Sequence, residues 1–279
     1  MTLLTFYPQL SLVRDALKGS HRRVYLVGGA LRDYYLNRHG TDFDFAVDGG
    51  SIALSRQLAR RLRGAFVLLD RAHGSARVVK KTDGVVWTFD LTDWRGRSIQ
   101  KDLGSRDFTI NALAMNIFDE GPVSSTVLEV KDSRRDIKTG VVRMVSPKVF
   151  KDDPLRLLRA FALQATLDFK IEAYTLGQIK KDAHLISTVA AERIREEIFK
   201  ILASPRAAET LTRMDKIALL PQVIPQITVM YGVKQGGYHH LDVWRHSLEV
   251  VATIEELTKE LSGHESMKAY LHQDRKSVV

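Results

Sequence analysis

Two aspartates, Asp42 and Asp44, stand two residues apart in a run where they alternate with Phe43 and Phe45. Because strand side chains alternate between two faces, both carboxylates would share one face while the phenylalanines point to the core. Neighbouring carboxylates repel each other unless a cation lies between them, and Mg²⁺ is a suitable cation because it takes oxygen ligands and keeps positions open for substrate phosphates. An isolated Asp-x-Asp is more often a solvated turn, but the preceding segment favours a catalytic magnesium site.

That segment contains the glycine pair Gly28 and Gly29. The apolar run Val24–Val27 predicts a buried strand before the pair, and Ala30–Leu36 suits a helix after it. Such a turn lets a phosphate approach bare backbone N–H groups, and Arg32 could add a forked cation. A tight turn without a ligand is the commoner reason for a glycine pair. Beside the two aspartates, the phosphate interpretation is favoured.

Two later segments offer further polar side chains. The β-prone run at 85–92 places Asp90 on a strand, either as a third acid beside the pair or as an ordinary surface aspartate. Residues 105–114 predict a helix that leads into a strand at 115–118. The polar side of this helix would present Arg106, Asp107 and Asn111, although a capped helix with solvated polar residues explains the same pattern.

The remaining pattern divides the chain into an α+β part and an all-α part. Helices are expected at 1–20 and 51–64, and short strands at 65–69, 76–80, 127–130 and 141–145. From about residue 147 the apolar period becomes that of a helix, with helices expected at 151–165, 172–181, 191–203, 207–219 and 243–261. We therefore expect a domain boundary near residue 147.

The first helix of the second part carries Asp153, Arg156 and Arg159 at three-residue spacing, which places them on one helix face. An ordinary ion pair is one interpretation. The other is recognition of a nucleobase, because a carboxylate only accepts hydrogen bonds and a guanidinium only donates them. Such a pair matches the pairing edges of C and A and mismatches those of G and U, and unpaired buried polar groups are costly.

Composition limits the possible partners. The chain has 279 residues, 44% hydrophobic and 27% charged, with a net charge of +9. This charge favours a polyanionic partner without distinguishing RNA, DNA or a membrane surface. The absence of cysteine excludes disulfides and fits a reducing compartment, so we expect a cytoplasmic protein. No signal peptide or membrane-spanning run is recognised, and no membrane or protein partner is expected.

Together these residues resemble the family of class II tRNA nucleotidyltransferases and bacterial poly(A) polymerases, within the polymerase-β-like superfamily. Five stretches match in family order over residues 24–200. They are Leu26–Asp33, Asp42–Asp44, Arg106–Ala112, Asp152–Arg156 with Arg159, and Glu192–Arg195.

The resemblance implies an enzyme in which an RNA 3′-hydroxyl attacks the α-phosphorus of CTP or ATP and pyrophosphate leaves. It implies a catalytic head (1–146) with a mixed sheet and flanking helices, followed by a helical neck (147–204) and a helical body (205–279). It also implies that Asp42 and Asp44 hold Mg²⁺, and that the acceptor arm of tRNA is the substrate. The incoming nucleotide would be bound by Gly28, Gly29, Arg32, Arg106, Asp107 and Asn111. Its base would be read by Asp153 and Arg156 with Arg159 nearby, and residues 192–195 would brace the neck helices.

The sequence also departs from the family pattern. Ser105 and Ala162 each stand where the family has an arginine, and Asp152 stands where a glutamate is commoner. These differences affect the finer nucleotide contacts. In CCA-adding members a long loop precedes the stretch that resembles 98–103, whereas here only Gly96 and Arg97 separate Arg95 from that stretch. The short loop resembles the CC-adding members, so we expect addition of CC. A full CCA-adding enzyme, a poly(A) polymerase and an inactive RNA-binding protein on the same scaffold remain alternatives.

Residues 238–246 resemble the start of a metal-binding HD domain, with His239, His240 and His246. The usual later His-Asp pair is missing, because His264 and His272 stand in no matching pattern. A vestigial or truncated body that grips RNA is the favoured interpretation, and the chain end could also be an artificial boundary or an incomplete gene product.

Overall fold

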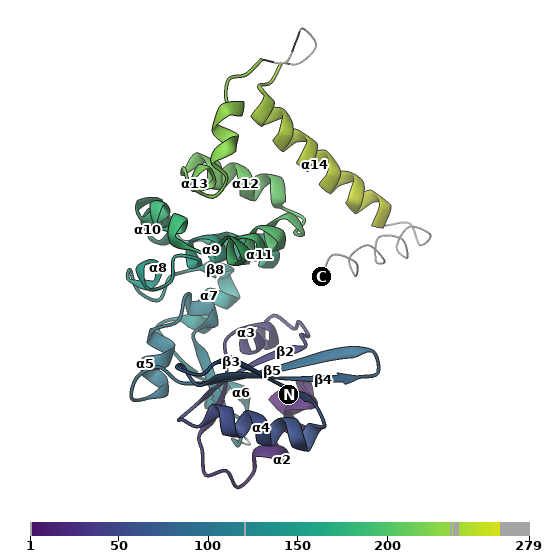
Figure 1. Ribbon diagram of the computed structural model, residues 1–279, viewed down its shortest axis with the longest axis vertical. Coiled ribbons are helices and arrows are strands. Elements are labelled where there is room, and N and C mark those ends of the chain that lie inside the picture. Colours follow the sequence, from purple (N-terminus) through teal and green to yellow (C-terminus); the bar gives the residue numbers. More distant parts are fainter. Residues whose placement is uncertain (1, 120, 235, 237–239, 263–279) are drawn as a thin grey trace. The chain divides into compact units, whose positions relative to one another are not determined.

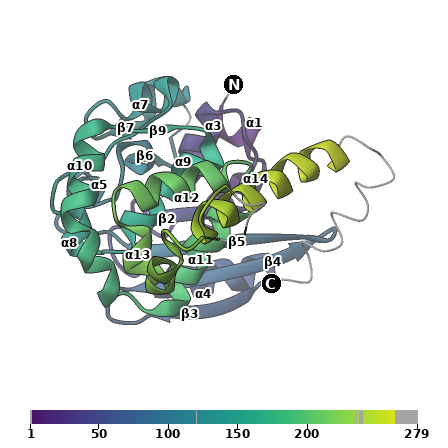
Figure 2. The same ribbon diagram turned by 90° about the horizontal axis from the view of Figure 1, so that it is seen from above.

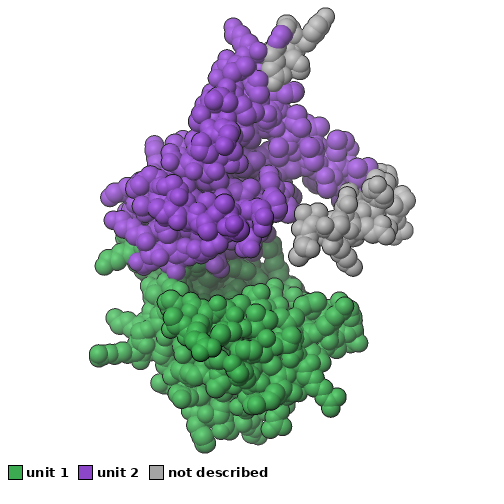
Figure 3. All heavy atoms as spheres, viewed as in Figure 1, with its two compact units in different colours: residues 1–149 green, residues 150–279 purple. Residues whose placement is uncertain are grey.

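The computed structural model describes residues 2–119, 121–234, 236 and 240–262 of the chain. It contains two compact units, residues 1–149 and 150–279, which are green and purple in Figure 3. The predicted separation of a neck (147–204) from a body (205–279) stays a prediction. No helix in the described ranges is long and apolar enough to cross a membrane.

Unit 1 is built on a mixed seven-stranded sheet in the order β3-β4-β5-β2-β1-β6-β7. The β2 and β5 strands are parallel, and the other neighbours are antiparallel. The strands are β1 (Val24–Val27), β2 (Asp42–Val47), β3 (Ala65–Asp70), β4 (Ser75–Thr82), β5 (Val85–Asp93), β6 (Leu113–Asn116) and β7 (Leu128–Glu129). The predicted α+β architecture, a mixed sheet with flanking helices, is confirmed.

Helices lie on both sides of this sheet, with α3 on one side and α2 and α4 on the other (Figure 1). The helices and the remaining short strand are α1 (Leu3–Phe6), α2 (Gln9–Leu17), α3 (Gly29–Tyr35), α4 (Ser51–Leu62), α5 (Ile99–Gly104), η1 (Thr109–Asn111), α6 (Val123–Thr126), α7 (Ser133–Thr139) and β8 (Val141–Val142). The expected N-terminal helix is divided between α1 and α2 because Pro8 lacks the N–H that a continuous helix requires. Its expected apolar face, Leu10, Val13 and Leu17, is buried.

The strand register arranges two rows of side chains on opposite faces of the sheet. Phe66, Val78, Phe89 and Phe43 are direct neighbours across β3, β4, β5 and β2. The next row along the same strands consists of Val67, Arg77, Asp90 and Asp44. Successive strand residues point to opposite faces, so the aromatic row packs into the core while the polar row faces away from it.

Unit 2 is almost entirely helical, as predicted. Its elements are α8 (Val149–Asp152, which begins at the last residue of unit 1), α9 (Arg156–Leu167), β9 (Lys170–Ile171), α10 (Ala173–Asp182), η2 (Ala183–Thr188), α11 (Ala191–Leu202), α12 (Ala207–Lys216), α13 (Leu220–Val223), η3 (Pro225–Met230) and α14 (Val243–Ser262). The α9 helix packs against α11 and α12 through buried residues that include Leu158, Phe161 and Ile201. The α14 helix lies beside α12, as Figure 2 shows from above.

Candidate active site

The β2 strand presents Asp42 and Asp44 on one face, as the sequence predicts. Both aspartates are exposed, whereas Phe43 and Phe45 are each only 1% exposed. The Phe43 ring stacks on Phe89 with centroids 5.7 Å apart. This aromatic packing fixes the orientation of β2, so the two carboxylates must project from the opposite face.

Asp90 lies directly beside Asp44 in the parallel register of β2 and β5, which places it next to the pair as expected. The sequence did not indicate that Arg77 on β4 would be its partner. The Nε and Nη2 atoms of Arg77 each donate a hydrogen bond of 2.8 Å to a different oxygen of Asp90. The hydrogen bond to Asp90 raises the pKa of Arg77, and the charges of Asp42 and Asp44 act in the same direction. A fixed cation therefore accompanies the acids.

Gly28 brings the glycine turn next to these acids. Its backbone has φ of 72° and ψ of −131°, a conformation that strongly favours glycine. A methyl group placed on Gly28 would lie 3.2 Å from Nη1 of Arg106 and 3.7 Å from Oδ2 of Asp44. Gly29 follows as the first residue of α3. The structure therefore brings together the glycine turn, an arginine and one of the paired aspartates.

A hydrogen-bonded chain links three more of the predicted residues. Nη1 of Arg32 donates to Oδ1 of Asn111 at 2.7 Å, and Nδ2 of Asn111 donates to Oδ1 of Asp107 at 3.3 Å. The other side of the Arg32 guanidinium grips Asp33 through two hydrogen bonds of 2.9 and 3.1 Å. The Arg32 side chain is only 13% exposed, and these hydrogen bonds to Asp33 hold its guanidinium in one orientation. The sequence analysis did not name Asp33 as a site residue.

Arg106 is anchored by Asp102 in α5, whose Oδ2 accepts from Nε and Nη2 at 3.1 and 3.0 Å. The other carboxylate oxygen of Asp102 accepts from the backbone N–H of Arg95 at 2.9 Å. The same carboxylate therefore positions Arg106 and fastens the connection between β5 and α5, which spans only residues 94–98.

The expected helix over residues 105–114 is wrong. Only Thr109–Asn111 form a turn of 3₁₀ helix, and β6 begins at Leu113. Phe108 is extended and forms a β-bridge with Met144. The Thr109 hydroxyl donates at 2.6 Å to Asp136, a buried carboxylate. These partners lie far along the chain and favour the observed conformation over a local helix.

The paired aspartates have the donor chemistry for Mg²⁺. Among the residues that the structure describes, no group of three or more histidine, cysteine or acidic side chains gathers as a metal site. Magnesium, however, commonly binds one or two carboxylates together with water and substrate phosphates. Asp42 and Asp44 supply two hard oxygen donors on an exposed strand face, so this pair fits a magnesium ion.

In unit 2, Asp153 does not share a helix face with Arg156 and Arg159, because α9 begins only at Arg156. The correction has a local cause: Pro154 disfavours helical backbone at the residue before it. Arg156 is buried and Arg159 is exposed. The Asp153 carboxylate accepts a hydrogen bond of 3.0 Å from Arg193, which belongs to the matching stretch 192–195.

The suggested histidine cluster near the C-terminus lies partly outside the described residues, because His239 is not among them. His240 and His246 are described, and they do not join a metal-binding group within the described part of the chain. Asp242 instead accepts backbone hydrogen bonds from Arg245 and Gly232, which lower its pKa.

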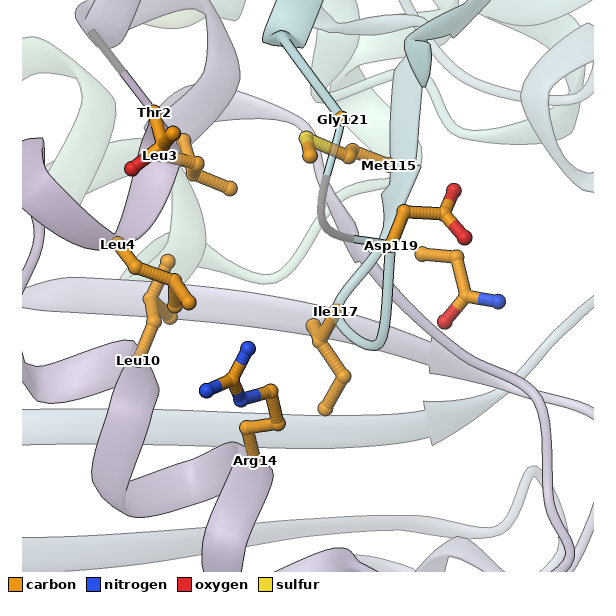
Figure 4. Close-up of a pocket in the computed structure, with 10 residues that line it drawn as sticks. Thr2, Leu3, Leu4, Leu10, Arg14, Met115, Ile117, Asp119 and Gly121 are labelled. Atoms are coloured by element: carbon orange, nitrogen blue, oxygen red, sulfur yellow. The ribbon is translucent and has the colours of Figure 1, made fainter.

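A separate pocket of about 140 Å³ lies away from the acids, between the N-terminal helices and the end of β6. Figure 4 shows apolar side chains around it, together with the guanidinium of Arg14. Leu3, Leu10 and Ile117 contribute to its wall. None of the predicted site residues lines this pocket.

Comparisons with known proteins agree with this geometry. The sequence family "Poly A polymerase head domain" matches residues 24–143. The family "Probable RNA and SrmB- binding site of polymerase A" matches residues 168–230.

A "CC-adding tRNA nucleotidyltransferase" of Geobacter sulfurreducens is 39% identical over 214 residues, 76% of this chain and 48% of the relative. An "A-adding tRNA nucleotidyltransferase" of Deinococcus radiodurans is 35% identical over 231 residues, 81% of this chain and 50% of the relative. The solved structure of a "tRNA nucleotidyltransferase complexed with a primer tRNA and an incoming ATP analog" matches with a TM-score of 0.72 and 27% identity, over 91% of this chain and 70% of that one.

The chain spans about half the length of the curated relatives it matches. The head-domain match, residues 24–143, spans the glycine turn, the paired aspartates, Arg32 and Arg106. The expected family is confirmed by these matches. The chain belongs to the family of tRNA nucleotidyltransferases and bacterial poly(A) polymerases.

Proposed function

We propose that this protein is a template-independent tRNA nucleotidyltransferase that uses Mg²⁺ to add nucleotides to the 3′ end of tRNA, with release of pyrophosphate. The observation that carries the proposal is the position of Gly28, with an Arg106 nitrogen and an Asp44 oxygen within 4 Å of the place its side chain would occupy. A glycine there leaves backbone open to a triphosphate between a cation and a metal-binding carboxylate.

Each residue group has a distinct role in this reaction. Asp42 and Asp44 hold the metal, which when bound stabilises the charge of the reacting phosphate and helps activate the attacking hydroxyl. Arg106, fixed by Asp102, donates hydrogen bonds toward the nucleotide phosphates. Arg32 is held in place by its hydrogen bonds, so it is oriented before the nucleotide arrives. Because both arginines are already oriented, their side chains do not have to rearrange when charge develops on the reacting phosphate.

Base selection is assigned to Asp153 and Arg156. The Asp153 carboxylate accepts from the amino group of C or A, and Arg156 donates to the ring-nitrogen acceptor beside it. G and U place an acceptor against the carboxylate and a donor against the arginine, so they are rejected. The hydrogen bond from Arg193 supports this role because it fixes the carboxylate before the base enters.

The product is proposed to be CC rather than CCA. The connection between β5 and α5 is short and fastened by Asp102, so the chain lacks the long loop that the CCA-adding members of the family have at this position. Sequence similarity alone does not select the product, since the relatives are named for different additions. CCA addition and poly(A) addition are the competing products.

The test offers the purified chain a tRNA that lacks its CCA end, with Mg²⁺ and with CTP alone, ATP alone or both. Product lengths are read on a sequencing gel. Two added C residues from CTP, with no further A when ATP is present, are the expected result. A complete CCA end would refute the argument from the short connection, while long A tails would identify a poly(A) polymerase.

The blank is the double variant Asp42→Ala with Asp44→Ala. If the unmodified chain adds no nucleotide while still binding tRNA, the proposed activity is wrong and the RNA-binding alternative is correct.

A further inference from the structure

Arginine is concentrated on α4, which covers one face of the sheet, and at Arg63, the residue that follows this helix. From residue 51 to residue 69 the chain carries four arginines and no acidic residue. The side chains of Arg56, Arg60 and Arg63 line a hollow of about 460 Å³ together with Phe66 of β3. We call this feature the arginine hollow. The fourth residue, Arg61, is exposed on the same helix but does not line it.

The arginines of the hollow keep their charge available to a partner. Arg56, Arg60 and Arg63 are exposed and form no ion pair within the described residues. The guanidinium of Arg56 lies over the Phe66 ring, 4.8 Å from its centroid. This contact orients Arg56 without neutralising it. Arg56 and Arg60 are four residues apart on α4, a spacing at which like charges repel, and a bound anion would relieve that repulsion.

The arginine hollow cannot serve the nucleotide bound at the paired aspartates. In the strand register, Phe66 belongs to the row of Phe43, which is buried, and Val67 belongs to the row of Asp44. Because Arg56 covers Phe66, the arginine hollow lies on the opposite face of the sheet from Asp44. It therefore needs a second anion, distinct from the reacting triphosphate.

We propose that the arginine hollow binds the phosphate backbone of the RNA substrate, at a point away from its reacting end. The planar guanidinium fork matches the oxygens of a phosphate. Arg56 and Arg60 lie one turn apart on the same face of α4, and Arg63 follows directly after the helix, so several phosphates of one strand can approach this group of cations. The carboxylates of an acidic protein would also pair with guanidinium groups, and such a partner would leave the salt dependence of tRNA binding unchanged when the arginines are replaced. This inference rests on the proposed function, because it takes the substrate to be RNA.

The test measures how RNA affinity depends on salt, because each neutralised phosphate adds about 0.9 to the slope of log K against log salt for a duplex. Binding of the full chain to a tRNA lacking its CCA end is followed by fluorescence anisotropy between about 50 and about 200 mM salt. The variants are the single change Arg60→Gln and the triple change Arg56→Gln, Arg60→Gln and Arg63→Asn. The matched control is Arg61→Gln, the same substitution on the adjacent exposed residue.

The expected result is a slope smaller by about one for Arg60→Gln and by about three for the triple variant, with the slope of Arg61→Gln unchanged. Equal slopes for the unmodified chain and all variants would overturn the inference. An equal decrease in slope for Arg60→Gln and Arg61→Gln would also overturn it, because that result would indicate a general effect of net charge. The single variants alter only exposed side chains, so they give an answer even if the triple variant does not fold.

Failure of this inference can be separated from failure of the proposed function. If the unmodified chain extends tRNA but its salt slope is insensitive to these arginines, only the arginine hollow is excluded as an RNA site. If the unmodified chain does not bind tRNA at all, both proposals are wrong.

Discussion

Replacing Arg77 with glutamine should damage catalysis more than it damages the fold. Arg77→Gln removes two charge-assisted hydrogen bonds to Asp90, each 2.8 Å long. The Arg77 side chain is 44% exposed and that of Asp90 is 19% exposed, so solvent screens much of the attraction. We expect a loss of about 1 kcal/mol in the free energy of unfolding, the upper end for an exposed pair, because the geometry is bidentate. For a chain of this size that loss lowers Tm by roughly 2–4 °C.

The effect on catalysis follows from the position of Asp90 beside Asp44. Without Arg77 the Asp90 carboxylate is free to move and adds uncompensated negative charge beside Asp42 and Asp44, the pair that we propose holds Mg²⁺. A displacement of about 1 Å at a reacting centre can cost about a hundredfold in rate, so we expect kcat/KM to fall by about 10- to 100-fold. Arg77→Lys should recover part of the rate, since it restores the charge but not the fork.

The assay combines steady-state CMP incorporation with thermal unfolding for Arg77→Gln, Asp90→Asn and the double variant. Lys81→Gln, an exposed residue on the same strand, is the matched control. If Arg77 acts through Asp90, the double variant should be no slower than Asp90→Asn alone. A lower Tm with unchanged kcat/KM for Arg77→Gln would refute the reasoning and leave the ion pair with a structural role only.

Three further predictions concern other parts of the molecule. Gly28→Ala should lower the free energy of unfolding by about 1–3 kcal/mol, because φ at Gly28 is 72° and the added methyl group would approach the Arg106 guanidinium. Urea unfolding measures this change, and an unchanged free energy of unfolding would contradict the strain argument. Arg193→Gln should reduce the preference for CTP over UTP by about tenfold by releasing Asp153, and an unchanged kcat/KM ratio would exclude that role. Burial raises the pKa of Tyr7 well above its usual value near 10, so the folded state retains a proton that the unfolded state loses. Stability should therefore fall as pH rises above about 10, and Tyr7→Phe should show a weaker fall in Tm over that range; an equal fall in the two proteins would contradict this assignment.

Short-range patterns predicted the strands that carry the acids. Asp42 and Asp44 alternate with phenylalanines, and the period of two directly gives the exposed and buried faces of β2. The position of Asp90 followed from the same alternation in β5. Arg77 was missed because its partnership depends on the register between β4 and β5, which joins residues 13 apart. A signal was present in the sequence, since Arg77 interrupts an otherwise apolar, β-prone run.

Two local errors have different causes. The segment at 105–114 was expected to be helical, but Thr109 bonds to a carboxylate 27 residues away, and no local pattern indicates that partner. The start of α9 was placed too early, although Pro154 gave a local warning, since it disfavours helical backbone at Asp153. Tertiary hydrogen bonds therefore account for the first error, and an underweighted steric rule accounts for the second.

The most direct test of the central claim measures the rate of CMP transfer to tRNA lacking its CCA end as a function of Mg²⁺ concentration. The unmodified chain is compared with Asp42→Asn and Asp44→Asn, and with Asp70→Asn as a control at an exposed aspartate. We predict transfer that requires Mg²⁺, a loss of at least about a hundredfold for either of the first two variants, and a normal rate for the control. Transfer at the normal rate without a divalent metal, or by the variants of the paired aspartates, would contradict this account.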